Sequence, residues 1–135
     1  MACSFLKLLS VCAMLICLKS TATATIVDIQ PEDIKDYADL IQGLYLAETK
    51  YTLESSVGGS IPFGFVPGTI ETSVDVVQGE LFRVTATIAP LSCIGSGPSA
   101  FCEEYTKTGC NFKVWSRPFL EPERRLLIMD WNCSP

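Results

Sequence analysis

The chain has 135 residues, of which 48% are hydrophobic, and a formal net charge of −5 at pH 7. This length suits one domain with a core of its own. Its ten basic residues form no stripe that could neutralise phosphates, so we expect no nucleic-acid partner. A solvated acidic surface is the simplest explanation of the net charge.

The first 24 residues have the pattern of a secretory signal peptide. Lys7 precedes an apolar run that extends to Leu18, and Ala22-Thr23-Ala24 offers a cleavage site with small residues. Cleavage after Ala24 would leave residues 25–135 as one secreted, extracellular domain. The apolar run is too short for a membrane anchor, and no later segment approaches a spanning length, so we expect no membrane association.

A single helix is predicted early in this domain. Residues 25–30 contain alternating apolar positions that favour a short strand or an extended arm. Pro31 and the acidic residues after it then suit a first helical turn, and apolar residues recur at helical spacing. We predict one amphipathic helix from about Glu32 to about Leu53. The Ser-, Gly- and Pro-containing stretch Glu54–Gly68 follows as a loop, and we expect its Phe63 and Phe65 to join the core rather than to bind a partner.

Two antiparallel hairpins are predicted after this loop. Residues 70–76 and 81–89 alternate between apolar and polar positions on either side of a turn at Val77-Gln78-Gly79, where Gly79 supplies a positive φ. Residues 110–117 and 126–131 form the second pair, separated by the loop at 118–122. The fold class is therefore α+β, with one helix lying across an antiparallel sheet of four to five strands.

Four cysteines remain after residue 24, and an even number in a secreted domain indicates two disulfides. Three connectivities are possible, and proximity in the sequence favours Cys93 with Cys102 and Cys110 with Cys133. A zinc site is not expected, because the chain has no histidine and no C-x-x-C pair among these cysteines.

The sequence lacks the residues of a catalytic centre. Without histidine, neither a Ser/His/Asp nor a Cys/His nucleophilic site can be built, and no glycine-rich phosphate loop follows a strand. We therefore expect neither an enzyme nor a cofactor nor a metal. The unusual feature is instead the pair Val76 and Val77 at a hairpin turn, where apolar residues are either packed under the fold or presented to a partner.

These residues resemble those of the secreted cystatins with two disulfides. In that family the first hairpin loop reads Q-x-V-x-G and the second carries Pro-Trp. Asp75-Val76-Val77-Gln78-Gly79 matches the first at Val77 and Gly79, and Pro118-Phe119 lies where Pro-Trp is expected. The run from Cys110 to Pro118 and the cysteine spacing are also similar to those of cystatins, so the resemblance spans most of residues 25–135.

The resemblance implies a monomeric inhibitor of papain-like cysteine proteases whose two hairpin loops enter the active-site cleft as a wedge. Its contact residues would be Asp75, Val76, Val77, Gln78, Gly79, Pro118 and Phe119. Val76 and Val77 would bury apolar area, Gly79 would let the backbones approach, and Phe119 would be an aromatic anchor.

A second hypothesis keeps the fold without the inhibition. Asp75 and Phe119 replace the family's Gln and Trp, and residues 25–30 contain no glycine to match the one near the N-terminus of cystatins. A non-inhibitory secreted binding or precursor module, as in the cathelin-like relatives of cystatins, would have the same hairpins and tolerate these differences.

Overall fold

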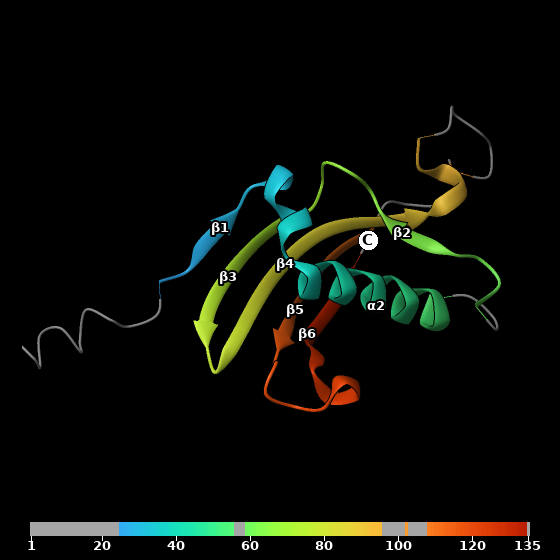
Figure 1. Ribbon diagram of the computed structural model, residues 1–135. Helices are drawn as coiled ribbons and strands as arrows, with labels where there is room; N and C mark the ends of the chain where they lie inside the picture. Colours follow the sequence, from blue (N-terminus) through green and yellow to red (C-terminus); the bar gives the residue numbers. More distant parts are fainter. Residues whose placement is uncertain (1–24, 56–58, 96–101, 103–107, 135) are drawn as a thin grey trace, which may run out of the picture.

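A computed structural model describes residues 25–55, 59–95, 102 and 108–134, so the predicted signal peptide lies outside the described residues. One long helix packs against an antiparallel sheet (Figure 1). Along the chain the elements are β1 (Val27–Ile29), η1 (Pro31–Asp36), α2 (Ala38–Ser55), β2 (Phe63–Phe65), β3 (Glu71–Val77), β4 (Gly79–Pro90), η3 (Leu91–Cys93), β5 (Thr108–Ser116), η4 (Pro122–Arg124) and β6 (Leu126–Ser134).

The predicted α+β class is confirmed, and the sheet is one strand larger than expected. Its order is β1-β3-β4-β5-β6, and β2 also pairs with β4. The twelve-residue β4 is long enough to have two partners on one side. It pairs with β3 through Thr85 and with β2 from Ile88 to Pro90. The sheet therefore has six strands rather than four to five.

The predicted helix is divided into two pieces. Residues 31–36 form the 3-10 helix η1, Tyr37 leaves the helical conformation with φ −108° and ψ 85°, and α2 begins at Ala38. The ring of Tyr37 packs edge-on against Phe82 of β4, with 5.7 Å between ring centroids. This contact with the sheet accompanies the break, and a helical pattern alone did not predict it.

The core lies between α2 and the inner face of the sheet. Alternate residues of β4 and β5 are buried there, as the sequence pattern predicts. From α2 the buried residues are Leu40, Gly43, Leu44 and Ala47. The helix approaches β5 closely at Gly43, where an added Cβ would lie 2.5 Å from Cγ1 of Val114.

The two phenylalanines of the predicted loop belong to the core. Phe63 and Phe65 of β2 are both buried. Their backbone N–H groups donate to α2, from Phe63 to Thr52 Oγ1 at 3.0 Å and from Phe65 to Glu48 Oε1 at 2.9 Å. These bonds attach β2 to the helix as well as to β4, so the expectation of a core role is confirmed.

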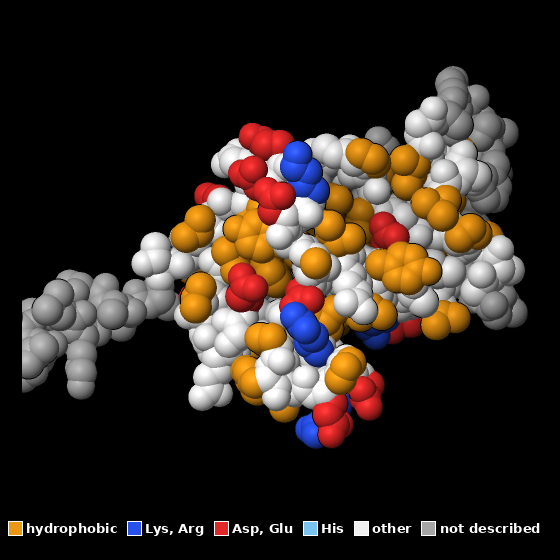
Figure 2. Space-filling view, viewed as in Figure 1, with side chains coloured by type: hydrophobic (Ala, Val, Ile, Leu, Met, Phe, Trp, Pro, Cys, Tyr) orange, Lys and Arg blue, Asp and Glu red, His pale blue; other side chains and the backbone are white. Residues whose placement is uncertain are grey.

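The solvent-facing side of α2 carries several apolar residues among its polar ones. Hydrophobic side chains are spread over the side of the molecule that carries the helix (Figure 2), and those exposed on α2 are Ile41, Tyr45, Leu46 and Leu53. Asp39 and Lys50 of the same helix are ion-paired with Arg125 and Glu54 respectively. No helix among the described residues is both long and apolar enough to span a bilayer.

Both disulfides follow the connectivity that proximity in the sequence favours. Cys93 is bonded to Cys102, and Cys110 is bonded to Cys133. The second bridge joins residues that are directly paired between β5 and β6, and Cys110 is completely buried. It therefore fastens the edge strand β6 to its neighbour β5.

Candidate functional site

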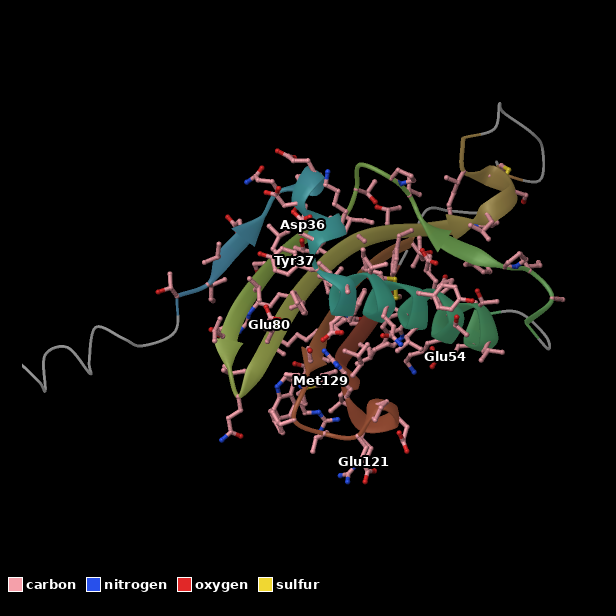
Figure 3. All side chains as sticks on the ribbon, in the orientation of Figure 1. Asp36, Tyr37, Glu54, Glu80, Glu121 and Met129 are labelled. Atoms are coloured by element: carbon pink, nitrogen blue, oxygen red, sulfur yellow. A yellow bond between two sulfur atoms is a disulfide. The ribbon has the colours of Figure 1, made fainter. Side chains whose placement is uncertain are left out.

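Two chain reversals lie at one end of the sheet. The β3–β4 turn and the β5–β6 loop are both at the lower end in Figure 1, whereas the turn after β4 is at the opposite, upper-right end. Figure 3 shows Glu121 in the β5–β6 loop at this lower end and Glu54 at the far end of α2, away from both reversals. The sequence-predicted contact residues come from these two reversals.

The first turn presents two valines to solvent. Val77 pairs with Gly79, so Gln78 is the single residue between the two strands. Val76 is 71% exposed and Val77 is 43% exposed. Of the two alternatives for apolar residues at this turn, exposure is therefore the one that the fold adopts.

Both the backbone conformation and the surroundings of position 79 require a glycine there. Its φ is +87°, as predicted, and an added Cβ would lie 2.0 Å from the backbone oxygen of Ser116 in β5. The first turn therefore rests directly on the backbone of the neighbouring strand. Contact between Gly79 and a partner remains a prediction.

Asp75 lies inside β3 and not at the tip of the turn. It pairs with Leu81 of β4, is only 8% exposed, and its Oδ1 atom has no hydrogen-bond partner among the described residues. Its side chain therefore contributes little to the exposed surface that the valines form.

The second reversal presents Pro118 and Phe119. The amide of Leu120 donates to the carbonyl of Arg117 at 3.0 Å, and the amide of Arg117 donates to the carbonyl of Arg125 at 2.8 Å. These bonds close the loop while Pro118 and Phe119 remain exposed, with Phe119 at 61%. We call the surface formed by Val76, Val77, Pro118 and Phe119 the two-turn edge.

A hydrogen bond connects the first turn to the strand that leads into the second loop. The indole Nε1 of Trp115 donates to the backbone oxygen of Gln78 at 2.8 Å. In the sequence, Trp115 is one residue of the alternating stretch 110–117. Its contact with a turn 37 residues away depends on strand order, which the local pattern does not contain.

Two further apolar residues lie close to the first turn. Ile26 and Val27 are both about half exposed. Val27 pairs antiparallel with Val74, so the chain before it runs along β3 toward Val76. The sequence suggested a strand or arm here, and the exposure of these residues extends the apolar surface beyond the two turns.

The ionic groups near the second loop hold it to the helix. Arg125 donates to Oδ2 of Asp39 at 3.0 and 3.2 Å, and the hydroxyl of Ser116 donates to the same atom. Among the residues that the structure describes, no three metal-ligating side chains come together. The features that distinguish this site are therefore the shape of the two reversals and their exposed apolar side chains.

Comparisons with known proteins agree with this architecture. No protein-family model matches the sequence, and no curated protein matches it either. A salivary cystatin from the soft tick Ornithodoros moubata has a similar structure, with a TM-score of 0.51 and 15% sequence identity. The match covers 83% of this chain and 98% of the tick protein. With its helix-covered antiparallel sheet and two disulfides, the chain therefore has the cystatin fold.

Proposed function

We propose that this protein is a secreted, reversible inhibitor of papain-like cysteine proteases. The observation that carries the proposal is the exposure of Val76, Val77 and Phe119 on two adjacent reversals of a cystatin fold. A secreted domain gains nothing in stability from placing such residues in water, so a partner that covers them gives a physical reason for their exposure.

The mechanism would be occlusion of the protease cleft. The two-turn edge would enter the cleft, and burial of the apolar area that the two valines expose would contribute about 25 cal/mol per Å², more for Val76 at 71% exposure than for Val77 at 43%. Phe119 would fill a pocket as the aromatic anchor. Because the sheet and its hydrogen bonds hold both turns before association, little conformational entropy would be lost on binding.

A titration of active protease tests the proposal. The oxidised protein starting at Thr25 would be mixed with papain and with a cathepsin L-like protease, and the remaining activity would be followed with a fluorogenic peptide. We expect stoichiometric inhibition at nanomolar concentrations, fully reversed on dilution.

Matched variants separate the two-turn edge from general surface effects. Val77→Asp places a charge at the edge and should raise the inhibition constant at least about tenfold, because the carboxylate would be desolvated in the cleft. Leu53→Asp makes a similar change at an exposed position on α2 and should leave the constant unchanged. Equal effects of the two variants would contradict the wedge mechanism.

The non-inhibitory module remains the alternative outcome. A folded, oxidised sample that fails to inhibit at micromolar concentrations would favour it. The differences from cystatins at Asp75 and Phe119 would then be the first positions to examine. Replacement of Phe119 by Trp should restore measurable inhibition if the second loop alone is deficient.

A further inference from the structure

The two reversals of the two-turn edge belong to different hairpins, so their relative position depends on contacts between β4 and β5. Besides the sheet hydrogen bonds, one side chain makes a direct connection. The Trp115 indole donates to the carbonyl of Gln78, which is the central residue of the first turn. Trp115 lies three residues before Pro118, so a single side chain spans from one reversal to the base of the other.

Arg117 continues this connection into the second loop. Its guanidinium carbon lies 5.0 Å from the centroid of the Trp115 ring, within cation–π distance. The same guanidinium donates through Nη2 to the carbonyl of Arg124 at 2.7 Å, across the base of the loop. The contacts therefore run without interruption from Gln78 through Trp115 and Arg117 to Arg124.

The far end of this series is fixed to the helix. Arg125, next to Arg124, is ion-paired with Asp39 in the first turn of α2, where a carboxylate is also favoured by the helix dipole. Besides the two hydrogen bonds from Arg125, Asp39 accepts a third from the hydroxyl of Ser116, whose backbone oxygen lies directly against Gly79 of the first turn. Both reversals are thus connected, through Arg125 and through Ser116, to the same carboxylate of Asp39 on α2.

We propose that Trp115 and Arg117 are positioning residues that set the separation of the two reversals for protease binding. The inference rests on the proposed function, since it assigns these residues a role in that same surface. Neither residue is required to touch the protease. Each would act by keeping the first turn and the second loop from moving independently, so that both can occupy one cleft at once.

The test is Trp115→Phe with Trp131→Phe as the matched control. The chain has two tryptophans, and Trp131 packs against Phe112 and Lys50 rather than against the reversals. Trp115→Phe keeps an aromatic ring beneath Arg117, although a smaller one, and removes the indole donor. We expect it to increase the dissociation rate of the papain complex on the order of 3- to 10-fold, as for the loss of one hydrogen bond. Trp131→Phe should leave that rate unchanged.

A second measurement detects the connection without any protease. In the Trp131→Phe variant, the only indole N–H resonance belongs to Trp115. We expect this proton to exchange with deuterated water more slowly than the indole proton of free tryptophan, because it is donated to Gln78. In Trp115→Phe, the amide protons of residues 77–79 should exchange faster than in the control.

The outcomes separate this inference from the proposed function. Slow indole exchange together with faster dissociation of Trp115→Phe supports the positioning role. Free exchange of the indole proton overturns it, as does an unchanged dissociation rate in an inhibitor that works. A protein that does not inhibit but protects its indole proton refutes the proposed function, and the positioning role in protease binding falls with it, whereas the hydrogen bond stands.

Discussion

Gly43 shows how a single missing side chain determines the distance between the helix and the sheet. A Cβ at this position would lie 2.5 and 2.8 Å from the two methyl carbons of Val114, far inside van der Waals contact. Both residues are buried, so neither can turn toward solvent. The close approach of α2 to β5 at this point therefore depends on glycine.

Gly43→Ala should destabilise the protein despite the better helix propensity of alanine. We expect a loss of about 1–3 kcal/mol in the free energy of unfolding, because the methyl group must displace Val114 or the helix. Urea unfolding measures the loss. Gly109→Ala is the control, since its Cβ would meet only the Ser134 backbone oxygen at 3.8 Å, and a change within about 0.5 kcal/mol is expected. Similar losses in both variants would refute the packing argument.

At the residue scale, the sequence predicted backbone requirements better than burial. The positive φ of Gly79 followed from its position in a turn, which is a local property. The burial of Asp75 did not follow. Its neighbour Val74 faces the core, so in an alternating strand the charged side chain of Asp75 is expected on the other face, in water. Its burial depends on the tertiary arrangement around β3, which no local pattern contains.

At the scale of elements, the hairpins were predictable and the irregularities were not. The alternating pattern predicts the strands flanking Gln78 because it has a fixed period and ends directly at the turn residues. The break at Tyr37 and the pairing of β2 with β4 both depend on contacts distant in the sequence, with Phe82 and with residues 88–90. The helical pattern continues through Tyr37 and therefore predicts one helix. In the structure, the segment is divided at Tyr37 into η1 and α2.

The two disulfides should contribute unequally to stability. The Cys110–Cys133 bridge spans 23 residues and the Cys93–Cys102 bridge spans 9. On the loop-entropy model, removing the longer bridge by paired Cys→Ala substitutions should cost about 3 kcal/mol. The loss should exceed that for the shorter bridge, because Cys110 is also completely buried.

Urea unfolding of the two paired variants under identical conditions measures this difference. Each double variant serves as the control for the other, since both remove two sulfur atoms and one cross-link. An equal or larger loss for the Cys93–Cys102 pair would show that the short bridge, rather than the attachment of β6, limits stability.

At the scale of the whole molecule, the sequence predicted which residues make up the candidate site but not what holds them together. The sequence predicts a site role for Val77 and Phe119 because they occupy hairpin reversals similar to those of cystatins. The contacts of Trp115 with Gln78 and with Arg117 need the order of β4 and β5 in space. That order is a property of the complete sheet.

Expression of the complete chain in a secretory cell tests the predicted processing. We expect the protein in the medium to begin at Thr25 and to contain two disulfides. N-terminal sequencing and mass measurement before and after reduction would establish both. A chain lacking residues 2–24 is the control and should remain in the cell. A secreted product that retains Met1 would contradict the signal-peptide prediction.

The covalent attachment of β6 to β5 also determines how the molecule responds to a mechanical load. A force applied at the C-terminus reaches Cys133 after one described residue, Ser134, and passes through the bridge to Cys110 in the neighbouring strand β5. The hydrogen bonds of β6 with β5 on the inner side of the bridge, from Asn111 paired with Asn132 to Ser116 paired with Leu126, are therefore shielded from that force and cannot be opened one at a time from the chain end. The segment enclosed by the two cysteines, which are 23 positions apart in the sequence, is roughly 80 Å long when extended, and it contributes nothing to the length that stretching can release while the bridge is intact.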